Sequence, residues 1–316
     1  MIAIRALSKH FNLAGGQVLQ AVDRVSLDIG EREILGLVGE SGSGKSTLGK
    51  TILGLHDKTS GEVLYRGECL PQRYKSADFK KYSTRMQMIF QDPASSLNPR
   101  MTMFEIVAET LRIQSNLSAA QIKDKVTVIL DKVGLSSAQM SRYPHEFSGG
   151  QKQRIGIARA LIHHPEFIVC DEPISALDVS VQAQIVNLLK AIKDEMSLTL
   201  LFIAHDLSMV RYISDRIAVM YLGVLVEVGP AAEVCQNPRH PYTQMLMASN
   251  PRPDPQYEKQ RRILPVLGEI AAPVNPGPGC RFAARCSLVM EKCHNSTPAL
   301  LAVDQQHAAA CFLNEH

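Results

Sequence analysis

The feature that most constrains this chain is a glycine-rich octapeptide that directly follows a short apolar run. Residues 34–38 (Ile-Leu-Gly-Leu-Val) form the run, and residues 39–46 continue as Gly-Glu-Ser-Gly-Ser-Gly-Lys-Ser. The run has the unbroken hydrophobicity of a strand buried on both faces of a parallel sheet, and Thr47–Leu55 has helical spacing. A strand, a glycine loop and a helix in this order predict a phosphate-binding loop, or P-loop.

The residue types in this loop suit a polyphosphate. Glycines let backbone N–H groups turn toward phosphate oxygens, and the next helix points its positive end at the same anion. We expect Lys45 to reach the β- and γ-phosphates and Ser46 to offer its hydroxyl to Mg²⁺. The candidate nucleotide-binding residues are Gly39, Ser41, Gly42, Ser43, Gly44, Lys45, Ser46 and Thr47. By itself the loop also fits kinases, GTPases and other nucleotide enzymes.

The rest of the chain alternates between strand-like and helix-like segments. Apolar runs at Met88–Phe90, Phe167–Cys170 and Leu198–Ala204 predict strands, and Arg154–Ile162 and Val181–Glu195 predict helices. This alternation predicts an α/β fold with a parallel sheet. Two helices are also expected within residues 102–135, with Ser118 as the N-cap of the second, and a closing strand pair is expected at Ile217–Met220 and Val224–Val228, with Gly223 at the turn.

An apolar strand that ends in two acids is the second chemical signal. Residues 167–170 are followed by Asp171 and Glu172. A carboxylate oxygen suits the ligand shell of Mg²⁺, which fits Asp171. Glu172 then stands where it can polarise a water that attacks the γ-phosphate. The alternative is a pair of acids that only interacts with the dipole of a following helix.

A third motif resembles one particular family. Phe147-Ser148-Gly149-Gly150-Gln151, followed by Lys152-Gln153-Arg154, is similar to the signature motif of ABC ATPases. Its hydroxyl, its backbone donors and the helix after it make a second anion cradle. In this family the cradle contacts the γ-phosphate held by the other ATPase subunit. The usual first residue is Leu, and the apolar Phe147 replaces it here.

Other positions of the family pattern are present in order. Gln91 matches the Q-loop glutamine, Asp178 ends the D-loop Ser175–Asp178, and His205 matches the switch histidine. Phe11 is the candidate aromatic that stacks on adenine. Taken alone, each has a plain alternative, since a lone His is often structural, a loop Gln is often solvated and a Phe is often core.

The resemblance covers residues 1–230 and implies a specific architecture. It implies a RecA-like parallel core, an antiparallel β subdomain and a helical subdomain at about residues 92–160. It implies ATP and Mg²⁺ as ligands, with Lys45, Gln91, Glu172 and His205 as catalytic residues. Mg²⁺ would be held by Ser46, Gln91 and Asp171. Ser148, Gly149, Gly150 and Gln151 would bind the nucleotide of a second ATPase subunit, most simply in a heterodimer.

The C-terminal part narrows the resemblance. Prolines become frequent from Pro230 onward, including Pro251, Pro253, Pro255 and Pro265, which predicts a boundary and a loop-rich module at 231–316. Asn237–Gln244 and Gln91–Arg100 resemble segments of the dipeptide, oligopeptide and nickel importer family, most like its F-type ATPase subunit. Peptide import is therefore the expected function. Uptake of nickel, a metal chelate or an antimicrobial peptide stays open, as does a soluble ABC ATPase outside transport.

Four of the seven cysteines cluster in this module, at Cys280, Cys286, Cys293 and Cys311. No C-x2-4-C pair typical of structural zinc occurs among them. Four thiolates are typical of [4Fe–4S] clusters, and residues 278–286 resemble the cluster-binding segment of peptide importers. The alternatives are zinc and free thiols. Arg281 and Arg285 are expected either to offset thiolate charge or to lie on the surface.

Composition limits the location and the partners. The net charge is +3 and the basic residues are scattered, which does not predict binding to nucleic acid. No apolar stretch approaches the ~20 residues of a membrane-spanning helix, and the N-terminus lacks the pattern of a signal peptide. We therefore expect a peripheral protein on the cytoplasmic face of the inner membrane. The family implies two transmembrane permease subunits and an extracytoplasmic substrate-binding protein as partners.

Overall fold

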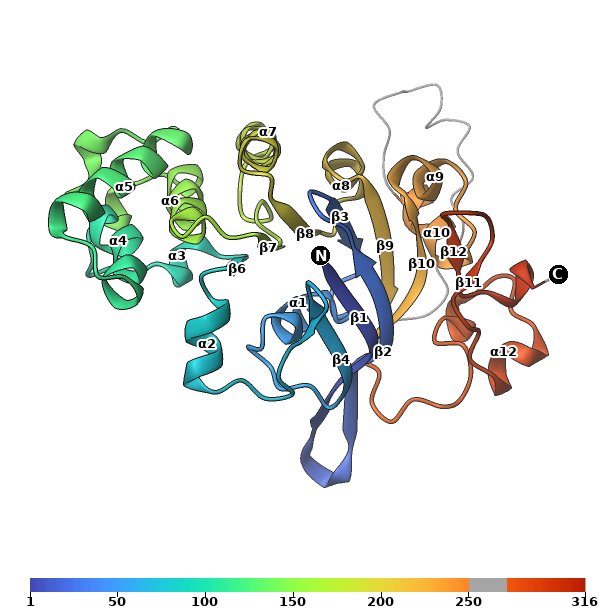
Figure 1. Cartoon of the computed structure of the whole chain (residues 1–316). Helices are drawn as coiled ribbons and strands as arrows, with labels where there is room; N and C mark the ends of the chain where they lie inside the picture. Colours follow the sequence, from blue (N-terminus) through green and yellow to red (C-terminus); the bar gives the residue numbers. More distant parts are fainter. Residues whose placement is uncertain (250–271, 316) are drawn as a thin grey trace, which may run out of the picture. The chain divides into compact units, whose positions relative to one another are not determined.

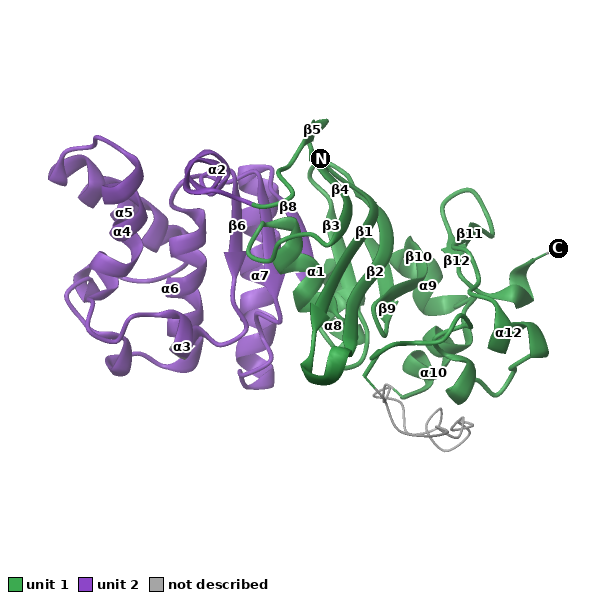
Figure 2. Ribbon diagram, turned by 90° about the horizontal axis from the view of Figure 1, so that it is seen from below, with its two compact units in different colours: residues 1–73, 204–316 green, residues 74–203 purple. Residues whose placement is uncertain are grey.

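A computed structural model of the chain describes residues 1–249 and 272–315. The chain forms two compact units, Met1–Arg73 with Ala204–His316, and Tyr74–Ile203, and each is described by itself (Figures 1 and 2). We call them unit 1 and unit 2. Pro251, Pro253, Pro255 and Pro265 of the proline-rich stretch lie outside the described residues.

Unit 1 contains an antiparallel sheet of four strands in the order β2-β1-β4-β5. The strands are β1 (Ile2–Asn12), β2 (Val18–Ile29), β4 (Ser60–Tyr65) and β5 (Glu68–Cys69). Apolar residues alternate along them, so Ile2, Ile4, Val63 and Tyr65 are almost fully buried. This one-sided burial is the pattern that antiparallel sheets with one solvated face show.

A second set of strands in unit 1 surrounds the predicted phosphate loop. β3 (Ile34–Val38) runs parallel to β9 (Arg216–Tyr221), and β9 pairs with β10 (Val224–Pro230). All five residues of β3 are buried, as expected for a strand covered on both faces. The β9–β10 turn places Leu222 and Gly223 at φ of 43° and 88°, which suits a tight two-residue hairpin and confirms the predicted turn.

The C-terminal tail extends this set of strands. β12 (Ala308–Ala309) pairs with β10, and β11 (Leu301–Ala302) pairs with β12. No sequence pattern predicts these two strands, because each has only two residues and carries no periodicity. The helices in the described part of unit 1 are α1 (Lys45–Ile52), α8 (Leu207–Ile213), α9 (Ala231–Gln236), α10 (Pro241–Ser249) and α12 (Glu291–Asn295).

Unit 2 combines parallel strands with a group of helices. β6 (Met86–Ile89), β7 (Phe167–Asp171) and β8 (Thr199–Ile203) pair in parallel. α4, α5 and α6 contact one another. The helices are α2 (Ser76–Tyr82), α3 (Pro93–Ser96), α4 (Met103–Gln114), α5 (Ala119–Lys132), α6 (Gly149–Leu161) and α7 (Val179–Met196).

Side-chain caps set where these helices begin. Thr102, Ser118 and Ser148 each accept a hydrogen bond from the backbone N–H three residues later, at the starts of α4, α5 and α6. Ser118 was predicted as a cap. The predicted start of a helix at Arg154 was wrong, because the Ser148–Gln151 capping box starts α6 five residues earlier.

The described strands and helices confirm the predicted α/β class. The boundary near residue 230 and the helical subdomain at about 92–160 stay predictions. Within the described residues, no helix is both long and apolar enough to cross a membrane.

Candidate active site

The loop between β3 and α1 lies against neighbouring backbone. Gly44 is the N-cap residue of α1 and has φ of 101°, a left-handed conformation that favours glycine. A Cβ at Gly44 would lie 2.0 Å from the carbonyl oxygen of Ala21, and one at Gly39 would lie 2.1 Å from that of Met220. These glycines are therefore required for close packing as well as for the phosphate approach that the sequence predicts.

Lys45 folds back over this loop. Its Nζ donates to the carbonyl oxygens of Gly39 (2.8 Å) and Glu40 (2.9 Å) and to Ser43 Oγ (3.4 Å). The side chain is 4% exposed. Ser46 and Thr47 follow in the first turn of α1. A positive charge is thus held in the middle of the loop, where the N–H groups of α1 also point.

The predicted catalytic acid occupies a strained position. Asp171 is the last residue of β7 and is 3% exposed. Glu172 follows with φ of 45°, which costs on the order of 1–3 kcal/mol for a residue other than glycine. Its N–H donates to the carbonyl oxygen of Ile203, and its Oε2 accepts a 2.9 Å hydrogen bond from Gln91 Nε2. The structure therefore brings Gln91 and Glu172 together, and the strain is typical of a functional site.

The signature motif forms the start of α6. Ser148 Oγ accepts from the N–H of Gln151 (3.4 Å), and Gln151 Oε1 accepts from the N–H of Ser148 (3.0 Å). Ser148 and Gly149 are exposed. A Cβ at Gly150 would lie 2.6 Å from Val181 Cγ1 of α7. An exposed helix N-terminus carries partial positive charge, so this motif can meet an anion from solvent.

The remaining candidates lie at the ends of elements. Phe11 is half-buried at the end of β1, where its ring meets His56 edge-on at 5.5 Å, so it is not a core residue. His205 is exposed and precedes Asp206, whose carboxylate caps α8. Asp178 is exposed at the N-cap position of α7, and its side chain makes no capping bond.

The candidates thus fall into two sets, one in each unit. Unit 1 holds the P-loop, Phe11 and His205, and unit 2 holds Gln91, Asp171, Glu172, the signature and Asp178.

Comparisons with known proteins give the same family for both units. A family model described as "ABC transporter" matches residues 22–175. The chain is 50% identical to the oligopeptide transport ATP-binding protein OppF of Haemophilus influenzae over 96% of its length and 92% of the relative's. It is 48% identical to OppF of Escherichia coli, over 99% of this chain and 96% of the relative.

The chain belongs to the ABC transporter ATP-binding proteins. The solved ATP-binding cassette MJ0796, a dimer bound to ADP and Pi, is 28% identical and matches with a TM-score of 0.67, over 73% of this chain and 99% of that one. The predicted ABC-type ATPase fold is therefore confirmed. ATP and Mg²⁺ fit a protein of this family.

A second family model, described as "Oligopeptide/dipeptide transporter, C-terminal region", matches residues 226–293 of this ABC ATPase. This region is organised around a buried acid, Glu227, which is 0% exposed. Its carboxylate accepts from the backbone N–H groups of Arg239 and His240 at 2.8 and 2.9 Å and lies 2.7 Å from His307 Nε2. Burial lowers the pKa of His240 to about 4. The segment 237–244 that first suggested the importer family is thus built around this acid.

The late cysteines of the ABC ATPase surround one cavity, whose lining includes Cys280, Cys286, Cys293 and Cys311. Burial raises the pKa of the Cys280 thiol to about 11 and also raises those of Cys286 and Cys311. Within residues 1–249 and 272–315, no three or more His, Cys, Asp or Glu side chains are grouped as ligands of a metal ion. The thiols therefore share a cavity without converging as an ion site.

The two arginines beside these cysteines behave differently from either expectation. Arg281 pairs with Asp23 at 2.8 Å, and Arg285 pairs with Glu40 at 2.7 Å, so neither is positioned on a thiol. Their side chains are only 9% and 5% exposed, so neither is a surface residue. Glu40 was not among the residues predicted from the sequence. The available signal was an acid inside a loop that is built to bind an anion.

Proposed function

We propose that this chain is the ATP-hydrolysing subunit of an ABC importer of dipeptides or oligopeptides. The observation that carries the proposal is the near-full-length identity to two oligopeptide transport ATP-binding proteins, together with the match of residues 226–293 to an oligopeptide/dipeptide transporter model. No described feature of the chain favours nickel, a metal chelate or an antimicrobial peptide over a peptide.

We assign the ATP-site residues by role. Lys45 and the P-loop backbone hold the phosphates, and Phe11 stacks on adenine. Ser46, Gln91 and Asp171 supply oxygens for Mg²⁺, a hard cation that prefers them. Glu172 polarises the attacking water, with Gln91 held on its carboxylate at 2.9 Å, and His205 contacts the γ-phosphate. The buried ammonium of Lys45 and the strained backbone of Glu172 support these roles.

We propose that Ser148, Gly149, Gly150, Gln151 and Asp178 act on the nucleotide of a second ATPase subunit. Exposure of Ser148, Gly149 and Asp178 supports this, because a group that meets another subunit must be accessible. Two permease subunits and an extracytoplasmic binding protein complete the assembly. The chain is then a peripheral subunit on the cytoplasmic face of the membrane.

The test is ATP hydrolysis by the purified complex, reconstituted with its binding protein. We expect stimulation by binding protein loaded with a dipeptide or oligopeptide. Stimulation by binding protein loaded with nickel or a metal chelate, and none with peptides, would contradict the peptide assignment. It would leave the ATPase assignment unchanged. An inactive complex, with nucleotide binding also absent, would overturn both.

We also propose that Cys280, Cys286, Cys293 and Cys311 hold a structural [4Fe–4S] cluster. The cavity they share supports this, because a cluster of several atoms needs ligands around a volume, whereas one zinc ion needs them at a point. Each sulfur also accepts a hydrogen bond from a backbone N–H. The donors are Phe282, Leu288, Met290 and Leu313.

Metal analysis of anaerobically purified protein tests the cluster. We expect brown protein that contains iron and acid-labile sulfide, with Cys286→Ser losing both. Cys69→Ser is the matched control, because Cys69 is exposed and lies outside this cavity. Zinc in place of iron, or neither metal with wild-type stability in Cys286→Ser, would contradict the proposal.

A further inference from the structure

Glu40 is an unexpected residue for a phosphate-binding loop. It is the second residue of the P-loop, so its carboxylate adds a negative charge to a loop that is expected to bind a polyphosphate. Like charges a few ångströms apart repel, and the repulsion is strong where water is excluded. The loop therefore binds an anion well only if something neutralises Glu40 or directs its carboxylate away.

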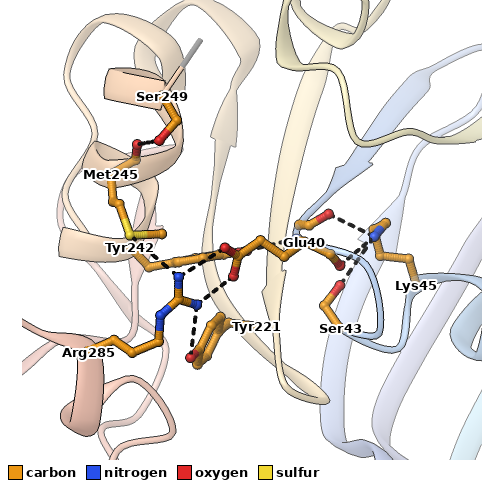
Figure 3. Close-up of polar contacts among 9 residues, drawn as sticks. Glu40, Ser43, Lys45, Tyr221, Tyr242, Met245, Ser249 and Arg285 are labelled. Carbon is orange, nitrogen blue, oxygen red and sulfur yellow. Dashed lines mark hydrogen bonds and ion pairs between the residues drawn. The ribbon is translucent and has the colours of Figure 1, made fainter. Parts of the chain in front are cut away.

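Arg285, in the C-terminal module, neutralises the Glu40 carboxylate and fixes its direction. Its two terminal nitrogens, NH1 and NH2, donate to Glu40 Oε2 at 2.7 Å and to Glu40 Oε1 at 3.0 Å, which makes a bidentate pair (Figure 3). The Arg285 side chain is 5% exposed and that of Glu40 is 24% exposed. The hydrogen bonds to Glu40 raise the pKa of Arg285 above its ordinary value, so the guanidinium stays charged. A bidentate pair fixes direction as well as charge.

Tyr242 holds the backbone of the same residue. Its hydroxyl accepts a 2.8 Å hydrogen bond from the N–H of Glu40, and its side chain is fully buried in α10. Two residues that lie 202 and 245 positions away in sequence thus contact Glu40 through its backbone and its side chain. In Figure 3 both reach Glu40 from the side opposite Lys45.

An aromatic cluster keeps both residues in place. The ring of Tyr221 lies 4.5 Å from that of Tyr242 and 5.2 Å from that of Phe282, and the Arg285 guanidinium lies 5.8 Å from the Tyr221 ring. Phe282 leads into the short 3-10 helix Ala283–Arg285, which ends immediately before Cys286. The arginine is therefore presented by the segment between two cysteines of the shared cavity.

We propose that Arg285 and Tyr242 are positioning residues of the ATP site, which hold and neutralise Glu40 so that the P-loop can accept the polyphosphate. The proposal rests on the proposed function, because it assigns the P-loop to ATP. It makes the C-terminal module part of the nucleotide site. Neither residue touches the nucleotide, and both act through Glu40.

Arg281 offers a matched control in the same segment. It is buried to a similar extent and pairs with an acid, but its partners are Asp23 at 2.8 Å and Gln20 at 2.5 Å on β2. If ATP affinity falls only because the C-terminal module is destabilised, it should fall equally in Arg281→Ala and Arg285→Ala. If ATP affinity falls because Glu40 of the P-loop is no longer held, it should fall only in Arg285→Ala.

The experiment measures KM for ATP and kcat in the assembled transporter for these variants. A misplaced binding loop can cost ~10²-fold. We expect Arg285→Ala to raise KM for ATP about 10–100-fold, with kcat changed much less. The reason is that the change weakens binding of the ground state and of the transition state equally. Arg285→Lys should fall between, since lysine keeps the charge but loses the bidentate geometry. Arg281→Ala should leave KM near the wild-type value.

Removal of the acid provides a rescue that a purely structural role would not give. Glu40→Gln added to Arg285→Ala should recover much of the lost affinity, because no unneutralised carboxylate remains. If Arg285→Ala fails to fold, Tyr242→Phe tests the other contact that holds Glu40, since it removes only the hydroxyl that accepts from the Glu40 N–H. Equal KM values in Arg285→Ala and Arg281→Ala, or no rescue by Glu40→Gln, would refute the positioning role. Wild-type protein that neither binds nor hydrolyses ATP would instead refute the function on which it rests.

Discussion

The chain carries two segments at helix N-termini that we propose as anion cradles, and they are built in opposite ways. The cradle ahead of α1 is enclosed: Ser43 and Lys45 are buried, and the backbones of Ala21 and Met220 press on Gly44 and Gly39. The cradle ahead of α6 is open. Ser148 and Gly149 are exposed, and the capping bonds are made locally, between Ser148 and Gln151.

The difference follows from where each phosphate is expected to come from. A loop that binds a nucleotide on its own chain gains from preorganisation, so distant segments are used to fix it. A cradle that completes a site on another subunit has to stay accessible, so it can be organised only by its own residues. The enclosure of the first cradle therefore supports a role in binding this chain's own nucleotide. The exposure of the second supports a role in completing the nucleotide site of another subunit.

The largest expected effect tests whether Glu172 serves the enclosed cradle. Glu172→Gln keeps the size of the side chain and its contact with Gln91 but removes the base, a contribution that is typically ~10²–10⁴-fold in rate. We expect kcat of the transporter to fall by that range while ATP stays bound. Glu195→Gln, an exposed acid at the end of α7, is the control and should keep wild-type turnover. Near-normal turnover in Glu172→Gln would exclude Glu172 as the base.

The next prediction concerns low pH, which should lower the folding stability of the module beside the enclosed cradle. Burial lowers the pKa of His240 to about 4, below the 6.5 of an exposed histidine. Between these values the unfolded chain binds a proton that the folded chain does not, so the folded state loses stability as the pH falls from 6.5 toward 4. The loss is on the order of 3 kcal/mol.

Urea unfolding at several pH values measures this dependence. His240→Asn keeps an acceptor for the N–H of Tyr242 but removes the titration, so its stability should vary less with pH. His145→Asn is the control near the open cradle, because His145 is exposed, and it should follow the wild type. Equal slopes in all three proteins would show that His240 does not titrate as proposed.

Nucleotide binding by the chain alone should separate the two cradles. Lys45→Ala removes a charged donor worth ~1.5–3 kcal/mol, so ATP affinity should fall about 10–100-fold. Ser148→Ala should leave the affinity of the isolated chain unchanged, because that cradle is assigned to another subunit's nucleotide. Titration with a fluorescent ATP analogue measures both. Equal losses in the two variants would mean that the chain uses both cradles on its own nucleotide.

The sequence predicted the enclosed cradle only in part. A local pattern, Gly39 to Ser46 between a buried strand and a helix, is enough to predict the loop and to propose roles for Lys45 and Ser46. The partners of Glu40 were missed because Tyr242 and Arg285 lie more than two hundred residues away and belong to no periodic pattern. Arg285 was interpreted through its neighbour Cys286, whereas its side chain pairs with Glu40.

The open cradle was easier to predict, since its geometry is local. The Ser148–Gln151 spacing is a capping box, and applying that rule would also have corrected the start of α6. The short strands β11 and β12 form a different case. The pairing of β12 with β10, and of β11 with β12, depends on the fold of the module around Glu227 and not on their own two-residue sequences.

The smallest expected effect separates two roles of Ser148, as the N-cap of α6 and as a proposed phosphate-binding residue. As an N-cap it stabilises α6, and its replacement by Ala typically costs ~1 kcal/mol. Ser118 caps α5 with the same capping-box geometry and has no proposed role with nucleotide, so Ser118→Ala is the matched control. Both variants should lose similar stability in urea unfolding, but only Ser148→Ala should also slow ATP hydrolysis in the assembled transporter. Equal hydrolysis rates in the two variants would leave Ser148 as a helix cap alone, and the open cradle would then lack the phosphate role that distinguishes it.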